Sequence, residues 1–425
     1  MKKEKDLLPL HKLFIAAGLP GILLFAWSIL IFAVTRRREY NAYDVVDDSA
    51  YIQIIFTFGV FVLLVYMLFS EQQKRKFFFS SPQIYLLLYT IVCLLSMLWA
   101  PNVFMTGFRA FESLTYLLLV SLVAYNLVVN VSVEEIIEWG ILWIIWDIIW
   151  SIAVKVKLNG YDVLLWPFDA SRLTVPIFFF FALMLTQRKR FKYIILLFAI
   201  FSVSNKVFFG IALGMLGFFW GDSRYKSWLF LAILAISVTL IFVNLDELLR
   251  NTLFYGRESV SLSNTSGRDK IWKIAWEAFQ QKPFLGYGYV SGENAVLYTK
   301  FNGAINAHNS IFSGLLGTGI AGTIFLILYF GSAFKKAGSR YFPSHKWRPA
   351  MVSTVIMCIV VSLTAPGIGS RVYGSWLPVV LVFTFISALE YKFNIIYHVY
   401  NTQRNTYDEN YLGNPFISRL SHSGL

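Results

Sequence analysis

The sequence predicts an all-α, polytopic membrane protein with about 12 transmembrane helices. Hydrophobic residues make up 57% of its 425 residues and only 14% are charged, whereas a soluble domain carries roughly 25% charged residues. The apolar segments are continuous rather than alternating, which excludes a β-barrel. The candidate spans cover residues 13–34, 51–70, 83–99, 107–129, 136–154, 173–187, 191–205, 206–220, 227–245, 308–333, 350–364 and 375–390. Segment 191–220 can also be read as one long span.

The distribution of positive charge predicts the orientation in the membrane. The net charge is +13, and most Lys/Arg clusters lie in short loops on the side of the basic N-terminus, which is the positive-inside bias. The sequence therefore predicts cytoplasmic termini and no binding of nucleic acid. The cluster from Arg36 to Arg38 disagrees, because it falls outside. The basic clusters that agree lie at 74–76, 188–192, 224–226 and 335–348.

The domain organisation is predicted to be simple. Residues 1–390 form a single transmembrane catalytic domain with one long outer loop at about 246–307, and residues 391–425 form a polar cytoplasmic tail that is disordered or interfacial. The first apolar run lacks a small-residue cleavage site and is interpreted as a span. Cys93 and Cys358 lie inside spans and are interpreted as small buried hydrophobes rather than a disulfide or a metal pair.

The outer loop contains a short amphipathic helix. Trp272, Ala275, Trp276 and Phe279 follow the spacing i, i+3, i+4 and i+7 and give one apolar face. Such a helix suits the membrane interface, with its Trp side chains at the depth of the headgroups. The alternative functions are a mere cover for the protein or one wall of a reactive site. Predicted boundaries are an N-cap within 264–266 and a stop at Pro283, followed by the turn 286–288.

Topology singles out one histidine. Of the five histidines, only His308 falls outside, at the start of the span 308–333. The helix dipole there disfavours an imidazolium, so a neutral imidazole could act as general base; the alternative is a capping or interfacial histidine. No second His or Cys lies nearby at ligand spacing, so no metal is expected. Gly314, Thr318 and Gly322 predict close helix packing that would hold His308 on a rigid element.

Several cations are predicted near the outer face. As a set they could bind a pyrophosphate, whereas for each alone the alternative is headgroup anchoring or snorkelling. These cations are Arg109, Arg172, Lys206, Arg268 and Arg371. Competing candidates for a base are the outer carboxylates Glu258, Asp269 and Glu293.

The motif GRDKIWKIAWEAFQQKPFLGYG, followed by AHNSIFSGLLGTGIAG, resembles the signature of the O-antigen ligase and polysaccharide polymerase superfamily over about 260–325. The segment LSMLWAPN and the long loop before the tenth span fit as well. The resemblance implies a GT-C-like helical fold in the bacterial cytoplasmic membrane, an extracytoplasmic active site and no metal or cofactor. It implies that Arg268 binds the lipid pyrophosphate and that His308 activates the acceptor hydroxyl. Lys206 stands where the family has arginine. Lysine keeps the charge but lacks the planar fork of the guanidinium group.

The resemblance implies undecaprenyl-pyrophosphate-linked glycans as donor and acceptor, with a flippase and a chain-length regulator as pathway partners. A polymerase of repeat units is favoured, because a composition rich in Lys, Ile, Phe and Asn is typical of AT-rich genomes, where capsule loci are common. A ligase that transfers a finished glycan is the alternative. A lipid-linked oligosaccharide flippase should show internal repeats or many charges inside spans, but no repeat is visible and Asp147 is the main mid-span charge.

Overall fold

The computed structural model describes residues 10–34, 48–132, 135–136, single positions between 139 and 156, 268–300, 306–342, 347–364, 368 and 376–410. Every regular element in these ranges is helical, so the predicted all-α class is confirmed for them. The predicted spans between 173 and 245 lie outside the described residues.

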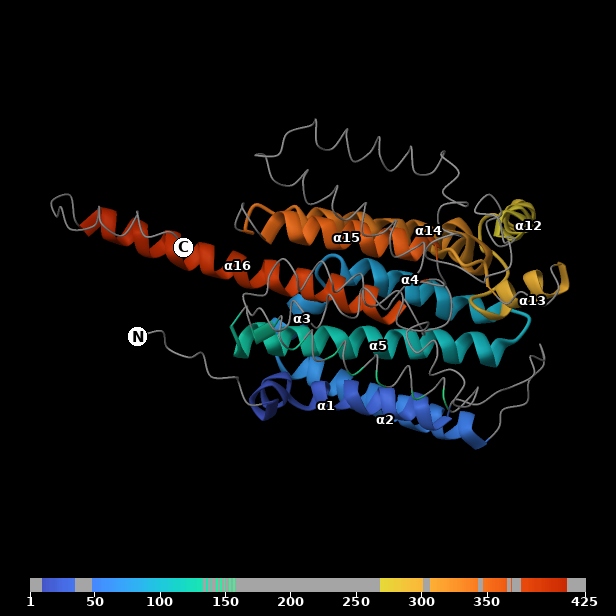
Figure 1. Ribbon diagram of the computed structural model, residues 1–425, viewed down its shortest axis with the longest axis horizontal. Coiled ribbons are helices and arrows are strands. Elements are labelled where there is room, and N and C mark those ends of the chain that lie inside the picture. Colours follow the sequence, from blue (N-terminus) through green and yellow to red (C-terminus); the bar gives the residue numbers. More distant parts are fainter. Residues whose placement is uncertain are drawn as a thin grey trace, which may run out of the picture.

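The described helices form a bundle with two short helices at one end (Figure 1). Most of the long helices run side by side along the bundle, whereas α12 and α13 lie at one end of it. The start of α1 and the end of α16 lie at the opposite end. The elements are α1 (Leu10–Val34), α2 (Asp48–Ser70), α3 (Gln72–Phe78), α4 (Gln83–Leu95), η1 (Ser96–Leu98), α5 (Val103–Asn130), α12 (Arg268–Gln281), α13 (Ser291–Lys300), α14 (Ser310–Ala337), α15 (Trp347–Thr364) and α16 (Trp376–Asn410).

Helix α5 is the central element of the bundle. In its most apolar stretch 83% of the residues are buried, compared with 28% in α2. It packs against α1, α2, α4 and α16, and Tyr116 and Leu119 on it are fully buried. The helix begins at the N-cap Asn102, whose side chain accepts a hydrogen bond from the N–H of Met105 at 2.9 Å.

Within the described ranges, three helices are long and apolar enough to cross a membrane, and four if the pair bent by 74° counts as one span. The three are Tyr51–Ser70, Val103–Asn130 and Ser310–Ala337, and the bent pair is Gln72–Phe78 with Gln83–Leu98. The three helices correspond, in this order, to the second, fourth and tenth predicted spans, and the bent pair corresponds to the third. The protein is therefore a membrane protein by the length and apolarity of these helices, while the total of about twelve spans stays a prediction.

Helix α1 is interrupted where the sequence predicted a continuous span. Gly18 has non-helical backbone angles, with φ of 65°. Two amides on α5 bind carbonyls beside this break: Asn126 Nδ2 donates to Ala17 O at 3.0 Å and Asn130 Nδ2 to Ala16 O at 3.3 Å. Because a bilayer offers no water to backbone groups, such a break needs partners from the protein, and α5 supplies them.

Helix α16 continues past Glu390 to Asn410, so residues 391–410 of the predicted tail are helical. Polar contacts at the boundary explain the continuation. Lys336 Nζ lies 2.7 Å from a carboxylate oxygen of Glu390, and Lys392 Nζ donates to the carbonyl of Val128 at 2.9 Å. The helix is thus fixed to α14 and α5 at the point where its composition becomes polar.

Candidate active site

A break in α14 joins this helix to the loop between α12 and α13. At Gly319 the backbone leaves the helical conformation, with φ of 63° and ψ of −159°. Loop 283–288 occupies the break, and its backbone satisfies groups that have lost their partners within the helix. The hydrogen bonds run from Tyr287 N to Leu316 O (2.7 Å), Gly288 N to Gly317 O (2.9 Å), Ile320 N to Pro283 O (2.8 Å) and Ala321 N to Phe284 O (3.2 Å). The motifs PFLGYG and GTGIAG are therefore two halves of one structure.

The glycines of both motifs permit this close approach. Gly286 has φ of 66°, and a Cβ there would lie 2.6 Å from the carbonyl oxygen of Leu316. A Cβ on Gly319 would lie 2.6 Å from the nitrogen of Leu285. Only glycine combines positive φ with so little space. The small residues of α14 were predicted to pack helices together, but at this break they admit the backbone of a loop.

The connection between α4 and α5 supports the same loop. Ser96 Oγ accepts the N–H of Tyr289 at 2.9 Å, and the indole N–H of Trp99 donates to Leu285 O at 3.1 Å. Thr106 Oγ1 donates to Tyr289 O at 2.9 Å. The segment LSMLWAPN, which the family resemblance singled out, therefore has a structural role: it fixes the loop against the end of the bundle.

Helix α12 packs on the bundle through a face that overlaps the predicted one. Ala275 and Phe279, two of its four predicted apolar residues, are buried, while Trp276 is 47% exposed. Ile271 and Ala278 are buried as well, and their spacing to Ala275 is helical. The helix packs on α13 and α14.

Trp272 lies against the segment that leads into α14. Its indole N–H donates to the carbonyl oxygen of Ala307 at 2.9 Å. Its ring stacks on Phe312, with centroids 5.9 Å apart and an interplanar angle of 19°. Trp272 was predicted at headgroup depth; in the structure its indole N–H binds protein. Helix α12 therefore contacts the segment that leads into α14 and is more than a surface cover.

Helix α14 begins at Ser310, so His308 lies two residues before it. The sequence had predicted His308 at the start of this span. Asn309 is the N-cap, and its side chain accepts the N–H of Ile311 at 2.9 Å and donates to Leu363 O at 3.0 Å. His308 itself has φ of 51°, and its N–H donates to Asn306 Oδ1 at 3.1 Å. Left-handed non-glycine residues are uncommon and concentrate at functional sites.

Glu293 ties α13 to both sides of His308. Its side chain is 1% exposed, and its Oε1 accepts the N–H of Ala307 at 2.8 Å and the hydroxyl of Ser313 at 2.5 Å. The sequence marked Glu293 only as one of several possible bases. Its position in the first turn of α13, after a glycine-rich turn, is compatible with a bond to a neighbouring segment, but sequence does not say which segment.

Arg268 is the first residue of α12 and is half-buried. It lies one helical turn before Trp272, about 6 Å along the axis, and residues four apart share a helix face. Partial burial lowers the pKa of its guanidinium, but arginine stays charged at neutral pH. The structure therefore places a partly desolvated cation on the helix that contacts the residue next to His308.

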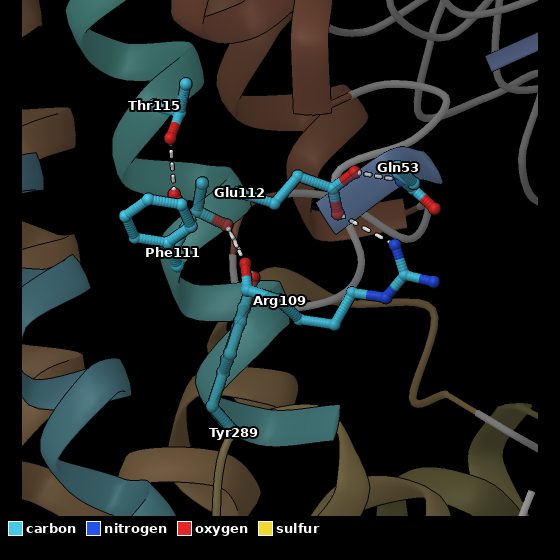
Figure 2. Close-up of polar contacts among 7 residues, drawn as sticks. Gln53, Arg109, Phe111, Glu112, Thr115 and Tyr289 are labelled. Atoms are coloured by element: carbon cyan, nitrogen blue, oxygen red, sulfur yellow. Dashed lines mark hydrogen bonds and ion pairs between the residues drawn. The ribbon is translucent and has the colours of Figure 1, made fainter. Parts of the chain in front are cut away.

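Arg109, another predicted pyrophosphate ligand, has a carboxylate partner (Figure 2). Its Nη1 lies 2.8 Å from Oε2 of Glu112, a fully buried residue whose Oε1 accepts a hydrogen bond from Gln53 Nε2 at 2.7 Å. This ion pair gives Arg109 a structural role, and its binding of pyrophosphate stays a prediction. The predicted ligands Arg172, Lys206 and Arg371 lie outside the described residues.

The described residues form a bundle of apolar helices, typical of a membrane protein, with the short helices α12 and α13 at one end. Residues 191–327 match the family model described as O-antigen ligase. This match supports the resemblance to the O-antigen ligase and polymerase superfamily that the motifs indicated. The matched segment includes Arg268, Glu293 and His308. No curated protein matches the chain.

Trp272→Phe tests whether the indole bond to Ala307 stabilises the site. Phenylalanine keeps an aromatic ring beside Phe312 and removes the N–H donor. We expect the midpoint of thermal unfolding in detergent to fall by roughly 1–2 °C, since one lost hydrogen bond costs about 1 kcal/mol. Trp276→Phe is the matched control, because Trp276 is largely exposed. Equal midpoints for the two variants would contradict the assigned contact.

Proposed function

We propose that this protein is a membrane glycosyltransferase that joins polyprenyl-pyrophosphate-linked oligosaccharide repeat units, of the undecaprenyl type, into a surface polysaccharide. The observation that carries the proposal is the placement of His308 and Arg268 around one contact between α12 and the entry to α14. The family match over 191–327 supports the same class of reaction. No metal or cofactor enters the proposed chemistry.

The proposed reaction is a direct displacement at the anomeric carbon of the donor sugar. His308 takes the proton of the acceptor hydroxyl as this oxygen forms the new glycosidic bond. The bond to the pyrophosphate oxygen breaks on the opposite face, so the anomeric configuration inverts. The leaving lipid pyrophosphate already carries negative charge, and Arg268 stabilises the additional charge by ionic hydrogen bonds. No acid catalyst is needed for this leaving group.

The apolar side chains beside the site suit the lipid part of the substrate. Phe284 and Leu285 of the loop are 73% and 50% exposed, although they lie next to spanning helices. In the proposed complex the polyprenyl chain contacts these side chains, while the sugars extend from the end of the bundle into water. Further exposed apolar residues on the α4–α5 connection are Leu98, Val103 and Phe104.

The proposed orientation puts the site outside the cell and both chain ends in the cytoplasm. The support is the arrangement in Figure 1, where α12 and α13 lie at the end of the bundle opposite the start of α1 and the end of α16. The basic clusters of the sequence favour the cytoplasm for the latter end. A flippase delivering lipid-linked units to this face, and a regulator of chain length, are the partners that this reaction implies.

A ligase is the second candidate, because the matching family model is described as O-antigen ligase. A ligase would use the same donor chemistry but would transfer a finished glycan to a different acceptor. Purified protein should be incubated with lipid-linked repeat units alone and then with an added glycolipid acceptor. A polymerase gives a ladder of increasing lengths from repeat units alone, whereas a ligase gives product only with the second acceptor. No transfer under either condition would reject both functions.

Arg268→Ala should lower the rate of glycan transfer about 100-fold to 1000-fold, the range for loss of one group that stabilises transition-state charge. Arg268→Lys should retain part of the rate, because lysine keeps the charge but loses the bidentate fork. The rate is measured from product per enzyme in detergent or liposomes. The matched control is Lys270→Ala, since Lys270 is an exposed cation on the same helix. An equal loss in this control would contradict a specific role for Arg268.

A further inference from the structure

We propose that Glu293 is a positioning residue for His308, and that it acts as a hydrogen-bond acceptor rather than as a proton-transfer group. This inference rests on the proposed function, because the role is defined by the reaction of His308. The carboxylate belongs to α13, whereas His308 precedes α14, so the two are joined only by the fold. In this role Glu293 is not a base, although the sequence analysis left it as one candidate.

Glu293 contacts the chain on both sides of His308. One oxygen, Oε1, accepts from Ala307 N at 2.8 Å and from Ser313 Oγ at 2.5 Å. Ala307 directly precedes His308, and Ser313 lies in the first turn of α14, which directly follows it. A single buried atom therefore fixes the backbone before the histidine and the helix after it.

Two further side chains hold the backbone at 307–308. The carbonyl of Ala307 accepts the indole N–H of Trp272 at 2.9 Å, and the N–H of His308 donates to Asn306 Oδ1 at 3.1 Å. Together with Glu293, these contacts satisfy successive polar groups of the chain at 307–308. Such over-determination can maintain the left-handed φ of 51° at His308, a conformation that costs free energy in an unconstrained residue.

Glu293 is too enclosed to reach a substrate proton. Its side chain is 1% exposed, and Ala307 at the same point is fully buried. A base must come within hydrogen-bond reach of the substrate proton, but Oε1 already accepts two protein donors and Oε2 is buried. His308 is only half-buried, so it is the group of the pair that an acceptor sugar can reach.

The test compares Glu293→Gln with Glu293→Ala in the full-length reconstituted protein, using lipid-linked repeat units as the probe. Glutamine keeps a carbonyl oxygen at Oε1, removes the charge and puts an NH2 donor in place of Oε2. We expect Glu293→Gln to keep kcat within about 3-fold of wild type, with an unchanged pH profile. Glu293→Ala should lower kcat about 10-fold to 100-fold with little change in KM, because a displacement of about 1 Å can cost about 100-fold in rate. Loss of activity in Glu293→Gln at a wild-type unfolding midpoint would overturn the proposal.

A double-mutant cycle with Ser313→Ala tests the same idea where Glu293→Gln folds poorly. If Ser313 acts through Glu293, its replacement lowers kcat in wild type but has no further effect in the Glu293→Ala background. Independent effects would overturn the inference. Full activity of Glu293→Ala beside an inactive His308→Asn would refute the role of Glu293 and leave the proposed function intact. Absence of transfer by the wild-type protein would instead reject the proposed function.

Discussion

His308→Asn is expected to abolish polysaccharide formation in cells and to lower the rate of glycan transfer in vitro about 100-fold to 10,000-fold, the usual contribution of a general base. Asparagine is the sharpest replacement because it tolerates the left-handed backbone conformation found at this position, with φ of 51°. The substitution therefore removes the imidazole and leaves the local fold in place. Product length is followed by gel electrophoresis of extracted glycans, and lipid-linked single repeat units should accumulate.

A second variant distinguishes a catalytic role of His308 from a purely structural one. His308→Gly also permits a left-handed backbone, so a purely structural role predicts that both variants stay active. Membrane expression and the midpoint of thermal unfolding should remain near wild type for His308→Asn. Long polymer at normal yield from either variant would contradict the assignment of His308 as base and would leave it a structural role beside the N-cap Asn309.

Much of the fold could be predicted because apolar length determines where a helix can cross a bilayer. The second, fourth and tenth predicted spans coincide with apolar helices of the structure within the residues it describes. Breaks in helices were missed. Gly18 and Gly319 look like tolerated small residues in apolar runs, and their role depends on distant partners: the amides of Asn126 and Asn130 in one case and loop 283–288 in the other.

The apolar face of α12 was predicted in part. Periodicity gives a helix and its possible faces, and Ala275 and Phe279 of the predicted face are buried in the structure. Ile271 and Ala278 are buried as well, because α12 packs on both α13 and α14. Trp272 is then available to donate a hydrogen bond to Ala307. No local pattern could reveal this bond, which joins residues 35 positions apart.

For the candidate site, topology and motif singled out His308 and Arg268 because each was unusual on its own. A single outer histidine and an arginine opening an aromatic helix are features of the sequence itself. The positioning role of Glu293 is different in kind, since it exists only when α13 is packed against the entry to α14. A signal was nevertheless present: Glu293 follows a turn with two glycines and lies in the first turn of a short helix.

Gly319→Ala is expected to have the largest effect on stability of any single-methyl addition in the described part of α14. Gly319 has φ of 63° and ψ of −159°, a conformation essentially limited to glycine that costs another residue about 1–3 kcal/mol. The Cβ of alanine there would overlap the backbone of Phe284 and lie 2.6 Å from the nitrogen of Leu285. The loop must then move, and the hydrogen bonds that fill the break are lost, so the total cost should reach about 3–5 kcal/mol. The expected result is a strongly reduced yield of monodisperse protein and an unfolding midpoint lowered by at least about 5 °C.

The matched control for Gly319→Ala is Gly331→Ala, because Gly331 lies in the same helix and a Cβ there would meet nothing within 4 Å. Alanine in a regular helix is favoured over glycine by up to about 1 kcal/mol, so this variant should unfold at the same temperature as wild type or slightly higher. The contrast isolates backbone conformation and space from helix propensity. Equal midpoints for Gly319→Ala and Gly331→Ala would show that α14 can close its break without the loop. The PFLGYG motif would then need another explanation than support of the helix that begins beside His308.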